Sequence, residues 1–407
     1  MVRKVLYPIY SLVAKLKYGQ KFLLISLLFL IPVAYLSFNM ISTRQADIRE
    51  LKKDQTGLAQ AGELMPLMLL GQQHRGLVDG YLNGKSDAVA GIEAVHGEAT
   101  GLLERIEADF RKDVLPEAYE QWTAIRQEWE AIQRTYDSLR ETESFNRHTE
   151  LVDRMLTLIV RIADESGLSL DDNIDSYYMM RLVAHELPTL MERTAIIRER
   201  GNDVLTWGTL EFTTRMELML ESYKAEVALD SLGLSLAELK ELLGAEEDSE
   251  LLTTAETARV QIAGYLDLME REILNATQIS MDPDDFVAEG TRVIASANEV
   301  FQQAVAELDR LLQDRIDANN RTLLMTSLLT IVALLLVFLF YAAFYQSVID
   351  TVRALRERAE AMAKGDFSEE VRLETRDELR EVGIAFNEMQ RALNRVLGNN
   401  RQVAEET

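Results

Sequence analysis

The sequence predicts an all-α membrane protein: two transmembrane helices enclose a large extracytoplasmic helical-bundle sensor, and a short parallel coiled coil follows. Three observations lead to this fold class. The 407 residues include only 6 prolines, which favours helices. Two long runs, residues 22–41 and 322–345, contain no charged residue. Elsewhere apolar residues recur at intervals of three and four, as they do along one face of a helix.

Composition excludes several classes of function. Without cysteine the chain cannot form a disulfide, an iron–sulfur cluster or a thiolate zinc site. The net charge of −24 argues against nucleic acid as a partner, because phosphate contacts need lysine and arginine. We expect no cofactor, no metal and no catalytic residue, so the chain is not predicted to be an enzyme. The four histidines lack the close helical spacing of a two-histidine metal site; they are His74, His96, His148 and His185.

The first apolar run, residues 22–41, is long enough to cross a hydrocarbon core about 30 Å thick. A cleaved signal peptide is the alternative, but the run is long for one and no small-residue cleavage site follows it before Arg44. We therefore expect an uncleaved anchor. Residues 1–21 contain no acidic residue, which places this segment in the cytoplasm. Its basic residues are Arg3, Lys4, Lys15, Lys17 and Lys21.

The second apolar run, residues 322–345, is long enough to span a membrane with some tilt. Two spans return the C-terminus to the cytoplasm. The predicted location is a bacterial inner membrane, with residues 42–321 in the periplasm. Residues 42–320 hold 27 basic and 54 acidic residues, so the acidity of the chain lies in this segment, whose net charge is −27.

The extracytoplasmic segment, residues 42–321, is expected to contain about eight helices, which is more than one four-helix bundle holds. We predict two four-helix bundles, side by side or stacked. Helix starts are predicted at Pro116, at Ser235 with Glu238 as a capping box, and at Asp282 with Pro283. Apolar residues seven apart mark the first and last helices of the segment: Leu51, Leu58 and Met65, then Val287, Ile294, Phe301 and Leu308.

Two Arg-Gly elements are the best candidates for ligand binding. Arg75 precedes Gly76 and Arg200 precedes Gly201. Each follows a stretch with Glu, Leu and Pro in that order, although the distance from proline to glycine differs. An arginine offers a planar fork of donors to a small anion, and glycine permits close backbone approach. The alternative, commoner in an acidic bundle, is that both arginines pair with acidic residues on neighbouring helices.

A relay of two short helices follows the second span, in residues 346–397. Its first apolar seam ends at Gly365, a connector follows, and Asp377 with Glu378 opens a second helix. Two such helices cannot form a stable core alone, so we expect a homodimer. The seams step by three and four: Val348, Val352, Leu355, Ala359 and Met362, then Leu379, Val382, Phe386, Met389, Leu393 and Val396.

This relay resembles the HAMP domain, the linker of bacterial chemoreceptors and sensor kinases. The resemblance rests on the first seam, on Gly365-Asp366 at its end, on the apolar connector and on Asp377-Glu378. Thr351 departs from the family, which usually has proline there, and this departure concerns the geometry at the start of the domain.

The sensor shows two further resemblances. The stretch Gln72-Gln73-His74-Arg75-Gly76 is similar to the Arg-Gly helix of nitrate- and nitrite-sensing helical domains. Asp175-Ser176-Tyr177-Tyr178 resembles a segment of large helical sensors in methyl-accepting chemotaxis proteins. The first resemblance implies a ligand-binding role for Arg75, and Arg200 follows from the internal repeat.

The leading hypothesis is a chemoreceptor that senses a small ligand, with an anion among the candidates. The resemblance implies that its partner is a chemotaxis histidine kinase complex, reached through an output domain that this chain lacks. Residues 398–407 would begin the output helix, and a fragment boundary is expected at Thr407. The alternative is the input half of a sensor histidine kinase or a cyclic-dinucleotide enzyme. A static membrane tether is disfavoured, because it has no use for a broken helix pair.

Overall fold

The computed structural model describes residues 7, 10, 11, 13–170, 173–242, 249–373 and 378–405, with side chains as far as residue 396 in the last stretch. These residues are 89% helical and include no strand, which confirms the predicted all-α class. The chain divides into two compact units, Gln45–Asn320 and Met1–Arg44 with Arg321–Thr407. Arg3, Lys4 and Asp377, used in the predictions above, lie outside the described residues.

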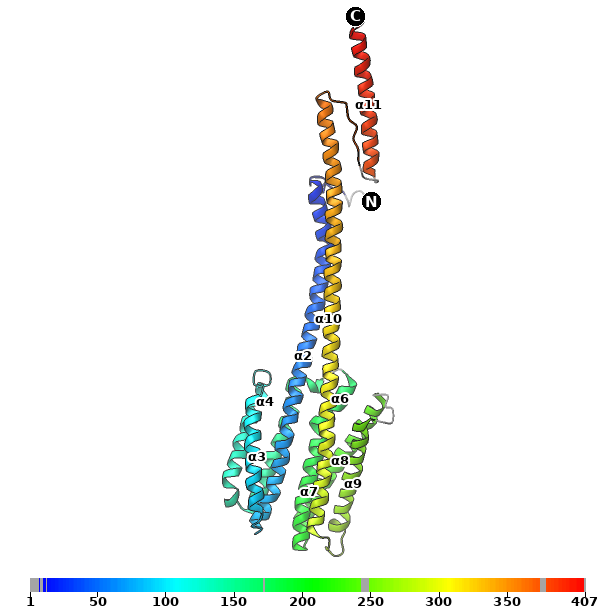
Figure 1. Ribbon diagram of the computed structural model, residues 1–407. Helices are drawn as coiled ribbons and strands as arrows, with labels where there is room; N and C mark the ends of the chain where they lie inside the picture. Colours follow the sequence, from blue (N-terminus) through cyan, green and yellow to red (C-terminus); the bar gives the residue numbers. More distant parts are fainter. Residues whose placement is uncertain are drawn as a thin grey trace. The chain divides into compact units, whose positions relative to one another are not determined.

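The unit Gln45–Asn320 contains two four-helix bundles that lie side by side rather than stacked (Figure 1). The first bundle consists of the C-terminal part of α2 (Tyr18–Leu82), with α3 (Ala88–Asp109), α4 (Pro116–Thr135) and α5 (Glu141–Ser166). The second consists of α6 (Ile174–Arg181) continuing into α7 (Leu187–Trp207), with α8 (Phe212–Leu242), α9 (Glu250–Met269) and the N-terminal part of α10 (Pro283–Ala363). Short helical segments join them: η1 (Tyr136–Ser138), η2 (Leu168–Leu170), η3 (Leu182–Glu186) and η4 (Glu270–Leu274).

One hydrophobic core runs through both bundles. It contains the fully buried Trp122 and Trp129 of α4 and the fully buried Phe286 and Phe301 of α10. The predicted seven-residue seams pack into it. Leu58 and Met65 on α2 are no more than 1% exposed, and so are Phe301 and Leu308 on α10. The two bundles therefore share a core and behave as one packed body.

Two predicted helix starts are confirmed and one is wrong. Helix α4 begins at Pro116, and α10 begins at Pro283, where Asp282 Oδ1 accepts the Asp284 N–H at 2.8 Å. Ser235, however, lies inside α8 and caps nothing. Its buried hydroxyl donates instead to Glu186 Oε1 at 2.8 Å. A buried carboxylate needs donors, and Ser235 supplies one from the neighbouring helix.

Glu186 stands at the end of the π-helical segment η3, between α6 and α7. Pro188 follows at the start of α7 and cannot donate a backbone hydrogen bond, so the wider π turn accommodates it within a continuous helix. The Glu186 carboxylate accepts from Ser231 and Ser235 and pairs with Arg181 at 2.9 Å. Helices α6, α7 and α8 are tied together at this point.

Both predicted apolar runs lie within single long helices, α2 and α10, each with a stretch long and apolar enough to cross a membrane. Within the unit Met1–Arg44 with Arg321–Thr407, the two helices touch. The rings of Phe22 and Phe344 meet edge to face with centroids 4.8 Å apart, and the hydroxyls of Ser37 and Thr330 are 3.5 Å apart. The two runs thus form a helix pair.

Candidate functional site

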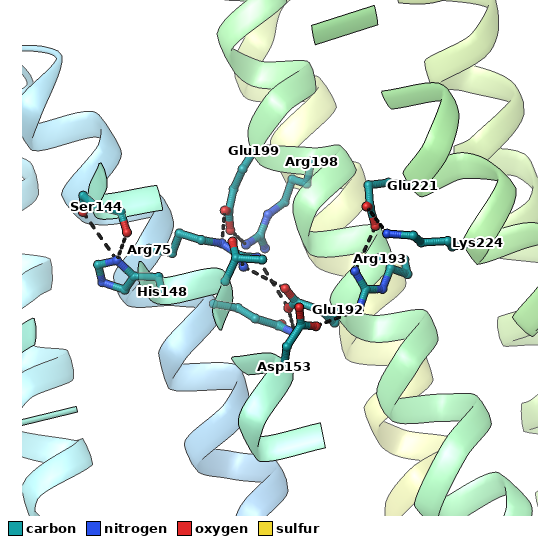
Figure 2. Close-up of polar contacts among 12 residues, drawn as sticks. Arg75, Ser144, His148, Asp153, Glu192, Arg193, Arg198, Glu199, Glu221 and Lys224 are labelled. Carbon is teal, nitrogen blue, oxygen red and sulfur yellow. Dashed lines mark hydrogen bonds and ion pairs between the residues drawn. The ribbon is translucent and has the colours of Figure 1, made fainter. Parts of the chain in front are cut away.

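Arg75 lies on α2 with its side chain fully buried (Figure 2). Its Nη1 donates to Glu192 Oε1 at 2.7 Å and to Thr149 Oγ1 at 3.0 Å, and its Nε donates to Glu199 Oε2. Glu192 and Glu199 belong to α7 of the second bundle, and Thr149 belongs to α5. Arg75 therefore ties the first bundle to the second.

Arg200 approaches the same place from α7. Its guanidinium lies over the ring of Phe145 on α5 at 3.5 Å from the centroid, and the Arg75 guanidinium lies 5.2 Å from that centroid. Arg200 also pairs with Asp203 at 3.7 Å and with Glu217 at 3.3 Å. The structure thus brings the two predicted site residues, which are far apart in the sequence, to one aromatic ring.

Charges around Arg75 are balanced by a network that crosses the sensor. Arg193 pairs with Asp153 at 2.8 Å and with Glu221 at 3.0 Å, and Lys224 joins Glu221 at 2.7 Å (Figure 2). Arg198 pairs with Glu199 at 3.3 Å. The ion pairs form two clusters on α2, α5, α7 and α8, and each has two basic and two acidic side chains: Arg75 and Arg198 with Glu192 and Glu199, and Arg193 and Lys224 with Asp153 and Glu221.

Burial sets the electrostatics of this network. It raises the pKa of Glu192, and the Arg75 charge opposes that rise. Burial would lower the pKa of Arg75, but Glu192 and Glu199 outweigh it and raise the pKa, so the guanidinium stays charged. Its donors already serve two carboxylates and a hydroxyl. An anion at Arg75 would compete with these partners, and the arrangement agrees with the ion-pair alternative.

Three of the four histidines, which looked scattered in the sequence, meet in a row. His74 Nδ1 is 2.6 Å from His148 Nε2, and His74 Nε2 is 2.8 Å from His96 Nε2. His148 Nδ1 lies 2.7 Å from the carbonyl oxygen of Ser144. The residues come from α2, α3 and α5. No sequence spacing could reveal this row, because helix packing alone brings the three rings together.

When all three rings are neutral, one placement of the ring hydrogens gives each contact a donor and an acceptor. A carbonyl only accepts, so His148 Nδ1 carries a hydrogen and its Nε2 accepts from His74 Nδ1–H. His74 Nε2 then accepts from His96 Nε2–H. Burial lowers the pKa of His74 to about 2 and that of His148 to about 4, which keeps both rings neutral. The row is a hydrogen-bonded chain of neutral imidazoles.

A cavity of about 700 Å³ lies beside the arginine network, between α2, α7 and α10. Gly76 lines it, and so do Glu199 and Arg198, which the sequence analysis did not single out. Neither Arg75 nor Arg200 lines it. Glu199 faces the cavity and also holds Arg75, so it connects the cavity to the buried network.

The first helix of the relay is the C-terminal part of α10, which ends at Ala363. Gly365 follows with φ of 89°, a left-handed conformation that closes helices at glycine, as predicted. The connector then lies along α11 (Glu378–Glu405). The Asn387 amide pairs with both backbone groups of Val371, at 2.8 and 2.9 Å, and Gln390 Nε2 donates to the carbonyls of Phe367 and Glu369.

Residues 343–395, which cover the end of α10, the connector and most of α11, match the HAMP domain family. The chain carries a HAMP domain. Thr351, where this family usually has proline, lies within the uninterrupted α10, and its hydroxyl donates to the Ser347 carbonyl at 2.9 Å. The threonine therefore lets the helix continue into the HAMP domain without a break.

No curated protein sequence matches the chain. Among solved structures, that of the NasR transcription antiterminator is similar, with a TM-score of 0.52 and 12% sequence identity over 91% of this chain and 99% of that chain. At this identity the likeness shows a shared helical fold alone. The HAMP domain, together with two apolar helices of membrane-spanning length, indicates a signal-transducing membrane sensor.

Proposed function

We propose that the chain is the input half of a transmembrane chemoreceptor, which senses a small ligand outside the cytoplasm and relays the signal through its HAMP domain. The HAMP domain is the observation that carries this proposal. The two helices that hold the apolar runs, α2 and α10, also belong to the sensor bundles. A shift of either helix in the sensor can therefore travel along a continuous helix. No catalytic step is needed.

The proposed location is a bacterial inner membrane, with residues 42–321 in the periplasm and both termini in the cytoplasm. Five basic residues before the first apolar run support this orientation. The excess of acidic residues in the segment between the runs agrees with it.

We propose a parallel homodimer. Within one chain the HAMP seams are left largely uncovered, because several seam side chains are 41% to 57% exposed: Val352, Val382, Met389, Leu393 and Val396. An exposed apolar surface made of several such side chains is typical of a protein–protein interface. A second copy presents the same seam in the same register, and insertion in the same membrane makes the two relays parallel.

Helix α8 carries a second uncovered seam in the sensor. Its outward residues step by four, three and four, while its inward residues pack in the core of the second bundle. The next seam position is the exposed Asp230. A second copy held nearby by the HAMP domain would cover this face. The outward residues are Met216, Leu220, Tyr223 and Val227, each 49% to 64% exposed.

A small anion remains the ligand proposed from the sequence, held by Arg75, Arg200 or both. The two guanidinium groups share the Phe145 ring, which supports a common site. Calorimetry of the protein in nanodiscs against nitrate, nitrite and short carboxylates tests it. Removing an arginine that holds the anion should weaken binding about thirtyfold or more. Unchanged binding in both Arg75→Ala and Arg200→Ala would place the ligand elsewhere.

The output is proposed to be a chemotaxis histidine kinase complex, reached through a domain that follows the HAMP domain. A histidine kinase or cyclic-dinucleotide enzyme is the second candidate, because HAMP domains serve sensor kinases as well. The test joins residues 1–397 to the kinase-control domain of a characterised chemoreceptor and measures kinase activity in membranes. Added ligand should change the activity. The variant Asn387→Leu, which releases the connector from α11, should abolish that response.

A further inference from the structure

The cavity between α2, α7 and α10 is a long groove, and two glycines on its wall leave room in it. Gly76 and Gly80 stand one turn apart on α2, and an added Cβ at either would make only ordinary contacts. Lining residues extend from Leu69 to Gly80 on α2 and from Asp284 to Asn298 on α10. At 1.5 Å per residue these stretches are about 16 and 21 Å long. The groove is therefore much longer than nitrate or a short carboxylate.

The groove contains two buried acceptors without donors. Asp79 Oδ1 and Asn298 Oδ1 have no hydrogen-bond partner among the described residues. Asp79 is only 8% exposed. A buried acceptor left unpaired costs free energy, so both oxygens favour a ligand that brings N–H groups. Asn298 lies at the far end of the α10 stretch, while Asp79 is near the end of the α2 stretch, beside Gly80.

The charges that line the groove favour a cation. Four carboxylates face two basic side chains, and one of these, Arg198, already pairs with Glu199 and donates to Thr291 at 3.0 Å. An acidic domain also concentrates cations near its surface. Apolar side chains line the groove between its polar groups, among them Leu77, Val287 and Ile294. The carboxylates are Asp79, Asp87, Glu199 and Asp284, and the second basic residue is Lys85.

Two further carboxylates stand behind Asp79. Oxygens of Asp79, Glu141 and Asp203 all lie within 4.8 Å of one another. Burial and the neighbouring Glu141 raise the pKa of Asp79 to about 6, and burial with Asp79 raises that of Asp203 to about 8, against the opposing charge of Arg200. Asp79 and Asp203 share a hydrogen bond in which Asp203 keeps its proton at neutral pH, and an ammonium group at Asp79 would supply a further donor.

We propose that this groove binds a linear aliphatic polyamine, long enough to carry amino groups to both ends of the groove. One ammonium group lies at Asp79, Asp87 and Asp284, the methylene chain packs on the apolar wall, and a second amino group donates toward Asn298. The inference rests on the proposed sensing function and adds a second ligand class, because the groove is a separate site that neither Arg75 nor Arg200 lines. Nitrate and simple carboxylates carry no N–H donor and would face four carboxylates.

The groove also suggests how such a ligand would act. It touches α2 and α10, the two helices that contain the apolar runs, and it touches Glu199, which holds the buried Arg75. An ammonium group that draws Glu199 or Asp284 toward itself changes the packing of α2 against α7 and α10. The side chains that bind the ligand are therefore the same ones whose movement changes the packing of the helices.

Calorimetry of the full chain in nanodiscs at fixed ionic strength tests the inference, with spermine and spermidine as probes, putrescine as an amine too short to reach both ends, and amino acids for comparison. We expect saturable binding with one polyamine per chain. Asp79→Asn should weaken it at least tenfold, and Asn298→Leu should weaken it as well. Gly80→Leu should abolish binding by filling the groove, whereas Gly80→Ala should retain it. Asp267→Asn, an exposed carboxylate on α9, is the matched charge control and should leave affinity unchanged.

Each of the following three outcomes would contradict the inference. If Asp79→Asn and Asp267→Asn weaken binding equally, the amine is a surface counterion. If only amino acids bind, and Gly80→Leu blocks them, the groove takes a zwitterion and the ligand class is wrong. If neither spermine nor spermidine binds while the kinase fusion responds to another compound, the proposed function stands and this inference fails.

Discussion

Arg75 and Glu192 form an ion pair across the two bundles, with Nη1 and Oε1 2.7 Å apart and neither side chain exposed. Glu192 also accepts from Gln72 Nε2 at 2.8 Å. Taking two charges out of water is costly, and the cost is recovered only when hydrogen bonds satisfy both groups. Thr149, Gln72 and Glu199 supply the remaining hydrogen bonds, so a few polar atoms join the two bundles in addition to their shared apolar core.

The first prediction concerns the stability of this contact. Arg75→Ala leaves Glu192 and Glu199 buried without their guanidinium, so it should lower the free energy of unfolding by about 3–5 kcal/mol. Adding Glu192→Gln and Glu199→Gln removes the unpaired charges and should restore part of the loss. Denaturant unfolding followed by circular dichroism measures both effects. An Arg75→Ala variant as stable as the parent would show that the pair contributes nothing.

Much of the fold could be predicted because local sequence rules determine it. Proline at the first turn marked α4 and α10, and seven-residue seams marked the helices at either end of the sensor. Ser235 misled the prediction, since its capping pattern occurs inside a helix where a buried carboxylate on another helix takes its hydroxyl. A local pattern cannot show a partner 49 residues away.

The candidate site could be predicted only in part. Arg75 was selected for its neighbour Gly76, but its two glutamates lie 117 and 124 residues further along the chain. Nothing in the sequence assigns those partners to one arginine. His74, His96 and His148 were set aside for the same reason, because their contact depends on how three helices pack. Tertiary pairing of polar groups was the information that the sequence lacked.

The second prediction concerns the stability of the fold at acidic pH. His74 and His148 are neutral in the fold, with pKa values lowered by burial from an ordinary value of 6.5. Unfolding lets them take up protons below pH 6.5, so the stability that they contribute is present above pH 6.5 and is lost as the pH falls toward 4. Arg75 and Arg147 lower the pKa of His148 further. At pH 4.5, two pH units below 6.5, the loss should be about 2.5 kcal/mol per histidine.

Thermal unfolding between pH 4.5 and 7 measures this loss. In His148→Gln the amide can still donate to the Ser144 carbonyl but takes up no proton, so the melting temperature should fall less steeply than in the parent. His185 lies outside the row, but burial lowers its pKa as well, so His185→Gln should also reduce the slope. Gln127→Ala, which replaces an exposed side chain on α4 that does not titrate, is the control. Equal slopes for His148→Gln and the parent would mean that the row does not resist protonation.

The third prediction concerns the stability of the fold at alkaline pH. The pKa values of Asp79 and Asp203 are raised above the ordinary 3.8, to about 6 and about 8, chiefly by burial. Stability from these groups is full below pH 3.8 and is lost as the pH rises through 6 and 8. Asp203→Asn removes one of the charges, so it should raise the melting temperature by a few degrees at pH 8.5 and by much less at pH 5. The same gain at both pH values would contradict this assignment.

The fourth prediction concerns the homodimer. The chain has no cysteine, so single cysteines introduced by mutation report one position each. Leu355→Cys and Phe386→Cys in the HAMP seams should crosslink to their own copies in membranes, because a parallel pair places each seam residue opposite itself. Arg356→Cys and Glu388→Cys, which lie off the seams, are the controls. Monomer at both seam positions would exclude the parallel relay.

The uncovered face of α8 gives an independent readout of the same dimer. Tyr223→Cys lies on the outward seam and is 64% exposed, so it should crosslink when the HAMP domains pair. Ala225→Cys on the inward seam of the same helix is fully buried and should not. Crosslinking at the relay without crosslinking at Tyr223 would confine the dimer to the HAMP domain.

The last prediction concerns orientation in the membrane. If α2 and α10 each cross once, Ser86 in the sensor and Asn399 after the HAMP domain lie on opposite sides. Five basic residues before the first apolar run place Asn399 in the cytoplasm. An impermeant maleimide applied to cells with a permeable outer membrane should therefore label Ser86→Cys and spare Asn399→Cys. Both should react after detergent lysis, which controls for accessibility. Labelling of Asn399→Cys but not Ser86→Cys in intact cells would reverse the orientation, and labelling of both would mean that the two runs do not each cross the membrane.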